Sequence, residues 1–198
     1  VRFAVACSSD ACRDEHGYHL RMKNCGRLSC PVCRDVAIAR AAARAVERIE
    51  GLTEAYEREG QRLGPIAHCQ LSPPPDSPLF SPEALSTQEG LNKAFTAARN
   101  MLKRYCRGYG GVLVLHPWRQ IHLDGTKCGR HDCQEKHTWT WSPHFHYLGV
   151  GWWIKSNEFY EATGWTYSKF GYGVKKRRGA DERQRSLINT LSYQLSHC

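Results

Sequence analysis

The sequence predicts an α+β fold in which a mostly antiparallel β-sheet lies at the centre and helices pack on it. Long segments rich in Ala, Glu and Arg carry apolar residues at three- and four-residue steps, the periodicity of an amphipathic helix. Shorter apolar runs, bounded by Gly and Pro, are typical of strands. Two of these runs follow each other with no helical segment between them, which favours antiparallel pairing. We expect a cysteine-rich element over residues 1–34 and a main domain over 35–198.

Three segments show helical periodicity. They cover residues 35 to about 62, about 82–106 and about 182–197. Gly64 follows the first segment and favours its end there. Ser81 and Pro82 suit the N-cap and first position of the second helix, and Asp181 suits the N-cap of the third. These end signals give each predicted helix a defined start or stop.

Four segments are predicted to be strands. They cover residues 66–72, 112–116, about 144–152 and 165–174, the last as a strand or a hairpin. Three prolines at 73–75 end the first strand, because proline cannot continue a ladder of hydrogen bonds. Residues at about 118–143 are rich in charge, Cys and His. We expect them to form an insertion in the main domain.

The charge balance favours a polyanionic partner. The chain has 28 Lys and Arg against 19 Asp and Glu, a net charge of +9, and nucleic acid is the simplest such partner. A basic surface without a specific partner is the alternative. Clustering argues against it, since four basic residues that can hold a phosphate backbone are consecutive: Lys175, Lys176, Arg177 and Arg178.

The sequence also predicts where the protein works. No apolar run approaches the roughly 20 residues that span a bilayer, and the first residues lack the apolar core of a signal peptide. The ten cysteines are spaced like metal ligands more than like a disulfide framework. We therefore expect no membrane contact, a reducing compartment and a cytoplasmic location in the host cell.

A histidine pair, His144 and His146, is the first candidate site. On a strand, residues two apart lie on the same face, so both imidazoles can bind one divalent metal. The third ligand is expected on a neighbouring strand. His116, which ends the preceding predicted strand, is the first choice; Glu135 is the alternative, because a carboxylate suits Mg²⁺ or Mn²⁺ better, and His68 comes third.

Tyr193 is the candidate nucleophile. An apolar stripe anchors the last helix to the sheet: Leu187, Ile188, Leu191 and Leu195. Tyr193 lies outside that stripe, in a polar row with His197 one turn further on. A tyrosine oxygen can form a covalent intermediate when a nearby base or metal helps it to ionise. The alternative is an ordinary amphipathic-helix tyrosine with a hydrated hydroxyl.

The cysteines predict one or two structural zinc ions. The first site takes four of five candidates, with His16 and His19 in reserve: Cys7, Cys12, Cys25, Cys30 and Cys33. Thiolate zinc would fold a segment with little apolar content of its own. The second site, in the insertion, consists of Cys128, His131, Cys133 and His137. The alternative there is a loop with free thiols and solvated histidines.

In combination these motifs resemble the HUH endonucleases, and more narrowly the single-tyrosine rolling-circle replication initiators of plasmids and viruses, archaeal members especially. The resemblance covers about residues 25–198. It rests on Ser142-Pro-His-Phe-His-Tyr-Leu148, Tyr193, Cys25-x4-Cys30-Pro-x-Cys33, His68-Cys-Gln-Leu-Ser-Pro-Pro74, Gly111-Val-Leu-Val-Leu-His-Pro-Trp-Arg119, Gly149-Val-Gly-Trp152 and Leu191-Ser-Tyr-Gln-Leu-Ser-His197.

The resemblance implies a mechanism and partners. A divalent metal, Mn²⁺ or Mg²⁺, held by His144, His146 and a third ligand polarises a phosphate of single-stranded DNA at a replication origin, in a hairpin. Tyr193 attacks it, giving a 5′-phosphotyrosine link and a free 3′-hydroxyl. Arg119 and the basic run bind DNA, and host replication proteins extend the 3′ end. The chain departs from the family in carrying Ser196 where many members have a lysine.

Three other interpretations stay open at this point. A transposase or a plasmid-transfer relaxase would use the same nicking chemistry on different DNA. In a zinc-containing DNA-binding module without catalysis, the histidine pair would be vestigial or structural. A metal-dependent hydrolase of small molecules would need a deep pocket instead of an open basic groove.

Overall fold

The computed structural model describes residues 3–5, 20–22, 34–126, 133–170 and 180–196. The chain divides into two compact units, residues 1–41 and 42–198. In the first unit β1 (Phe3–Val5) pairs antiparallel with β2 (Leu20–Met22). Helix α1 (Arg34–Arg58) begins in the first unit and continues into the second. The second unit carries the sheet and both candidate sites described below.

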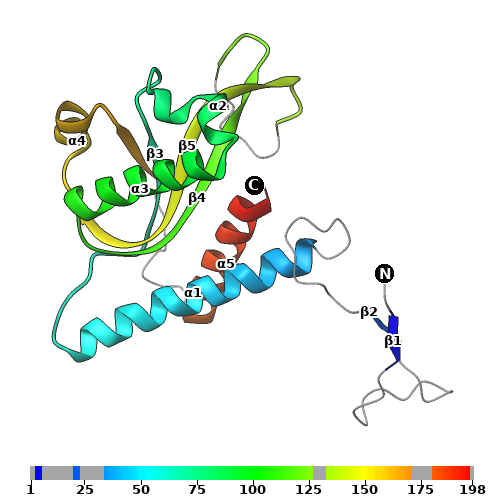
Figure 1. The fold of residues 1–198 in the computed structure, drawn as a ribbon. Coiled ribbons are helices and arrows are strands. Elements are labelled where there is room, and N and C mark those ends of the chain that lie inside the picture. Colours follow the sequence, from blue (N-terminus) through cyan, green and yellow to red (C-terminus); the bar gives the residue numbers. More distant parts are fainter. Residues whose placement is uncertain (1–2, 6–19, 23–33, 127–132, 171–179, 197–198) are drawn as a thin grey trace. The chain divides into compact units, whose positions relative to one another are not determined.

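An antiparallel sheet of order β4-β5-β3-β6 forms the centre of the second unit (Figure 1). Its strands are β3 (Ala67–Ser72), β4 (Cys106–His122), β5 (His137–Trp153) and β6 (Thr166–Phe170). β5 pairs with β4 on one side and β3 on the other, and β6 pairs with β3. The expected α+β architecture with an antiparallel sheet is therefore confirmed.

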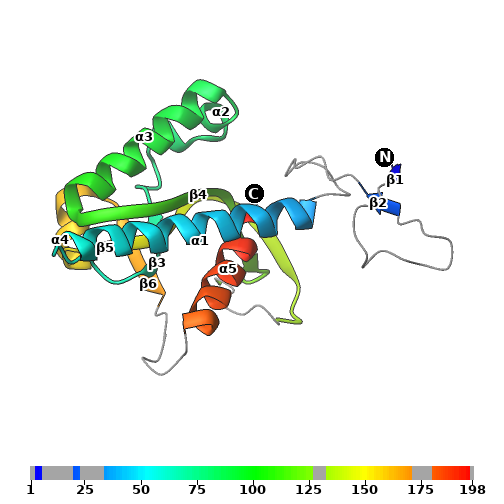
Figure 2. The same cartoon turned by 90° about the horizontal axis from the view of Figure 1, so that it is seen from below.

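Helices cover both faces of the sheet, and each face has its own core. On one face α2 (Pro82–Leu85) and α3 (Gln88–Tyr105) lie over β4 and β5, as the view from below shows (Figure 2). Buried Phe145 and Tyr147 point into that core. On the other face α1 and α5 (Ala180–Ser196) pack against residues such as Leu148 and Val150. Because successive side chains of β5 point to opposite faces of the sheet, this strand contributes residues to both cores.

The apolar stripe predicted for the last helix is confirmed. Leu187 and Leu191 are buried against α1, β4 and β5, and Ile188 and Leu195 pack at the edge of that core. The helix begins at Ala180, so Asp181 lies in its first turn and is not the N-cap that we expected. Gln184 also donates to the Glu50 carboxylate of α1 at 2.8 Å. One face of α5 thus packs on the sheet. Other side chains of the helix contribute to the candidate site described below.

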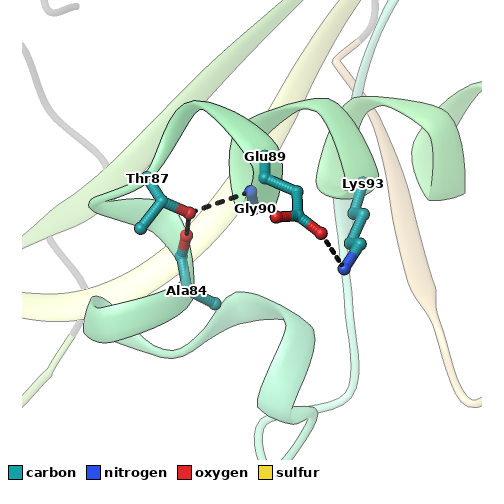
Figure 3. Close-up of polar contacts among 5 residues, drawn as sticks. All are labelled: Ala84, Thr87, Glu89, Gly90 and Lys93. Atoms are coloured by element: carbon teal, nitrogen blue, oxygen red, sulfur yellow. Dashed lines mark hydrogen bonds and ion pairs between the residues drawn. The ribbon is translucent and has the colours of Figure 1, made fainter.

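The single helix expected over residues 82–106 is two helices. Ser81 does cap the first, its hydroxyl accepting from Ala84 N at 3.2 Å. Thr87 then starts a second helix: its hydroxyl accepts from Gly90 N at 3.0 Å and donates to the Ala84 carbonyl at 3.0 Å (Figure 3). A Cβ at Gly90 would lie 1.8 Å from that carbonyl, so the break requires glycine there.

The two central strands are longer than periodicity predicts. β4 and β5 form a continuous ribbon, paired from Cys106 opposite Trp153 to His122 opposite His137, with register shifts at two places. The described residues of the segment expected as an insertion, 118–126 and 133–143, form the outer end of this ribbon and the stretches directly beyond it. The structure also contains α4 (Ser156–Thr163), which we did not predict; Gly164 ends it at φ 70°. No helix among the described residues has the length and apolar character that a bilayer span requires.

Candidate metal centre

Three histidines meet on the face of the sheet that carries α5. His116 of β4 lies directly opposite His144 of β5, and His146 is two residues along the same strand. One ring nitrogen from each of the three lies within 4.8 Å of the others. His116 and His144 are buried, and His146 is partly buried. The register therefore brings the first-choice third ligand to the histidine pair, as the alternation of side chains on adjacent strands requires.

Hydrogen bonds orient these rings and determine which nitrogen is left for a metal. His144 Nδ1–H donates to the Ser142 carbonyl at 2.7 Å, which leaves Nε2 with its lone pair. His116 Nε2–H donates to the main-chain carbonyl of Gln194 at 2.8 Å, which leaves Nδ1. Metal-binding histidines typically donate their second ring nitrogen to a carbonyl or carboxylate in this way. Both rings are held in place before any ion binds.

His68 of β3 connects the third histidine to α5. Its Nε2 lies 2.7 Å from His146 Nδ1 and 2.8 Å from the side-chain nitrogen of Gln194. Both neighbours donate to that nitrogen in the protonation pattern that leaves His146 Nε2 for a metal. Phe170 of β6 covers His68, with 4.7 Å between ring centroids. His68, the third choice as a ligand from the sequence, is thus placed behind His146.

The environment keeps these imidazoles neutral, the form that binds metal. Burial, followed by the neighbouring histidines and Arg119, lowers the pKa of His146 to about 2. Burial and then His116 lower the pKa of His68 to about 4. His146 can therefore bind a divalent metal without losing a proton. Three imidazoles suit transition metals better than Mg²⁺, which prefers oxygen ligands.

Tyr193 lies on α5 immediately before Gln194, the residue that contacts both His68 and His116. The tyrosine side chain is 49% exposed, whereas Gln194 is 1% exposed. One helix therefore presents an accessible phenol and, at the next position, a buried amide fixed to the histidines. His197, expected one turn further on, lies outside the described residues.

Arg119 is a basic residue that lies close to this centre. It is half-buried, its Nε donates to the Ser142 hydroxyl at 3.3 Å, and its positive charge contributes to the low pKa of His146. With the Gln70 amide oxygen turned toward it, both guanidinium Nη atoms donate to that oxygen at 2.5 and 3.2 Å. Gln70 is the register partner of His146.

A register shift explains why Arg119 reaches this face. In a regular strand Trp118, two residues after His116, would share its face. The ladder is irregular between His116 and Trp118, and Trp118 pairs with Trp141, which donates to the Phe80 carbonyl on the other side of the sheet. Such irregularities re-aim side chains next to functional sites. Here the irregularity brings a guanidinium, and not an indole, beside the histidines.

The remaining predicted site residues are elsewhere. Cys133 and His137 lie together but with His122 as their third partner, and Glu135, the alternative catalytic ligand, is 2.8 Å from His122 Nδ1. Their expected zinc partners Cys128 and His131 lie outside the described residues. So do the first zinc site and the basic run: Cys7, Cys12, Cys25, Cys30, Cys33, Lys175, Lys176, Arg177 and Arg178.

Sequence reasoning missed two residues of these sites. Gln194 carried no signal, because its role depends on how α5 docks. His122 would have been found if the second predicted strand had been extended through the charged segment, since His122 would then lie opposite His137. Comparisons of the chain with known protein families, with curated proteins and with solved structures found no match.

Proposed function

We propose that this protein is a site-specific single-stranded DNA endonuclease that nicks and rejoins DNA through a 5′-phosphotyrosine intermediate, and that it starts rolling-circle replication. The observation that carries the proposal is the combination on α5: the half-exposed Tyr193 directly precedes Gln194, whose carbonyl is bonded to His116, one of the three clustered histidines. The resemblance of these motifs to HUH endonucleases supplies the reaction. The net charge of +9 supports a nucleic-acid substrate.

His116, His144 and His146 would hold one divalent metal ion, through Nδ1 of the first and Nε2 of the other two. Such an ion supplies positive charge to the scissile phosphate and so favours the transition state. Because the donors are all imidazoles, we expect Mn²⁺ to support the reaction better than Mg²⁺.

The covalent step belongs to Tyr193. Its phenolic oxygen forms a bond to phosphorus as the bond from phosphorus to the 3′-oxygen breaks, and the phenolic proton passes to solvent. The departing 3′-oxygen takes a proton from water and becomes a 3′-hydroxyl that a polymerase can extend. Attack by that hydroxyl on the phosphotyrosine reverses the exchange, so rejoining needs no external energy source.

The other residues of the site position the reactants. His68 of β3 contacts His146, and Gln194 of α5 contacts His116 and His68. These contacts fix the position of α5, and with it Tyr193, relative to the three histidines. Arg119, beside His146, offers a guanidinium to the phosphate backbone that flanks the scissile bond. Reactive groups held in place in this way contribute to the rate through orientation.

The test is covalent trapping. The protein is incubated with Mn²⁺ and with tiled single-stranded oligonucleotides that cover the DNA encoding it, and adducts are separated on a denaturing gel and mapped by mass spectrometry. We expect one oligonucleotide to yield an adduct on Tyr193 through a 5′-phosphate. Tyr193→Phe should yield none, while Tyr160→Phe, which alters an exposed tyrosine on α4, should react like the wild type.

Three results would overturn the proposal: an adduct that persists in Tyr193→Phe, an adduct on another residue, or none from the whole panel. In the last case tight binding of the same oligonucleotides would favour a non-catalytic DNA-binding module. A positive result on transposon ends or transfer origins, and not on a replication origin, would keep the chemistry and reassign the protein as a transposase or a relaxase.

A further inference from the structure

The outer end of the β4–β5 ribbon carries a second metal-binding group. His122, the last residue of β4, lies opposite His137, the first residue of β5, and their ring centroids are 4.6 Å apart. Cys133, in the connecting segment, contributes a sulfur, and one donor atom of each residue lies within 4.8 Å of the others. We propose that His122, Cys133 and His137 bind a structural Zn²⁺ ion that closes the end of this ribbon.

The donor chemistry selects zinc. Thiolate and imidazole are the donors that Zn²⁺ favours, and these three residues would fill three of its four tetrahedral positions; they suit Mg²⁺ or Ca²⁺ poorly because those ions prefer oxygen. All three side chains are partly buried. The buried His137 Nε2 makes no hydrogen bond within the described part of the chain, an arrangement that leaves its lone pair for an ion.

Glu135 supports the proposed site from outside. Its Oε2 lies 2.8 Å from His122 Nδ1, while the carboxylate itself is 75% exposed. A carboxylate paired with one ring nitrogen of a metal-binding histidine orients the ring and makes the other nitrogen a stronger donor. This assigns Glu135 to the zinc site as an orienting residue, in contrast to its expected alternative role at the catalytic metal.

The local structure explains what the ion would do. Beyond His122 the chain turns back on itself, with His122 N donating to the Thr126 carbonyl at 2.8 Å. Apolar packing is sparse there, since Leu123 is 68% exposed and Trp139 57% exposed. A metal that joins both strand ends to Cys133 would stabilise this end of the ribbon in place of hydrophobic contacts. Because the site forms only when the chain is folded, the free energy of metal binding adds to the free energy of folding.

The test measures the alkylation rate of Cys133 alone, so that the other cysteines do not affect the result. The full chain, purified with zinc, is alkylated with N-ethylmaleimide before and after treatment with a strong zinc chelator, and the Cys133 peptide is quantified by mass spectrometry. We expect chelation to raise the alkylation rate of Cys133 by at least about tenfold, because bound zinc masks the thiolate. His122→Ala and His137→Ala should show the fast rate without the chelator.

Metal content gives a second measurement. Each of His122→Ala, Cys133→Ser and His137→Ala should lower bound zinc by one equivalent per chain, whereas the neighbouring exposed variant Gln134→Ala should not. Glu135→Gln should keep the ion but weaken its affinity by about tenfold. An unchanged Cys133 alkylation rate after chelation, or equal zinc content in all variants, would overturn the proposal. Neither measurement involves DNA, so the result is independent of the nicking activity proposed above.

Discussion

His116, His144 and His146 are held by different partners although they share one face of the sheet. His144 bonds to the carbonyl of its own strand, His116 bonds to α5, and His146 contacts β3 through His68. The site is therefore assembled from four elements, β3, β4, β5 and α5. Replacement of any one ring removes both a metal donor and the hydrogen bond that fixes its position.

Alanine at His116, His144 or His146 should abolish nicking while leaving DNA binding largely intact. Each variant loses one of the three proposed metal donors, whereas the basic residues proposed to bind the phosphate backbone are unchanged. Cleavage of the origin oligonucleotide and fluorescence anisotropy with the same oligonucleotide measure the two properties. Equal losses of binding and of cleavage would count against the metal role, and Thr138→Ala, an exposed position on β5, serves as the control.

Two buried thiols predict a loss of stability at high pH. Burial raises the pKa of Cys69 to about 11 and that of Cys106 to about 12. Their pKa values are higher in the folded state than in the unfolded chain, so stability is complete below about pH 9 and falls as the pH rises toward 11. Urea midpoints between pH 8 and pH 11 should decrease more steeply in the wild type than in a Cys69→Ala, Cys106→Val double variant. Parallel curves would contradict the assignment.

At the scale of elements, two glycines with opposite environments test how tightly the second unit is packed. Gly51 lies within α1, and a Cβ there would meet nothing within 4 Å. Gly64 precedes β3, and a Cβ there would lie 2.2 Å from the main chain of Gly151. Gly51 is therefore tolerated in its helix, whereas Gly64 is required by a close approach of two backbones.

Gly51→Ala should stabilise the protein by roughly 1 kcal/mol, since alanine loses less backbone entropy in a helix. Gly64→Ala should destabilise it by about 2 kcal/mol, the cost of forcing two backbone segments apart. Urea denaturation with an unchanged m-value gives both differences. The prediction fails if the two variants shift the midpoint in the same direction.

The elements were predictable where local periodicity decides them. The long first helix, the strand that carries His68 and the anchored stripe of the last helix follow from residue spacing. The break at Thr87 did not, because the apolar pattern continues through it while the threonine cap and the close approach at Gly90 end the first helix. The length of β4 was missed for a different reason. Its outer half is polar and exposed, so cross-strand pairing determines it and alternation does not.

The candidate site shows the same division. Spacing along one strand identified His144 and His146, and the rule that adjacent strands place side chains together identified His116. The place of Arg119 beside the histidines follows from a register shift, and the role of Gln194 follows from the docking of α5. Both depend on tertiary structure that no local pattern contains.

At the scale of the whole molecule, the excess of positive charge predicts DNA binding that depends strongly on salt. The chain carries a net charge of +9, and its densest basic run is Lys175 to Arg178. Affinity for a single-stranded oligonucleotide should fall by about tenfold or more between 50 and 200 mM salt, because bound counterions are released. Replacing all four basic residues by Gln should lower the slope of log affinity against log salt by about 0.7 for each phosphate that the variant no longer neutralises. A slope unchanged in the quadruple variant would place the DNA-binding residues elsewhere.

The bond from His116 to Gln194 has a consequence for how α5 can be studied. Its acceptor is a main-chain carbonyl in the last turn of the helix, where such groups lack a partner within the helix. His116 of β4 thus provides a hydrogen-bond donor for the C-terminal end of α5. Because the acceptor is a main-chain carbonyl, no side-chain substitution within α5 removes it. A mutational scan of the helix will therefore detect the side-chain contact of Gln194 with His68 but not the main-chain contact with His116. Replacement of His116 removes this bond from the other partner. We expect it to increase the rate of amide hydrogen exchange in the last turns of α5.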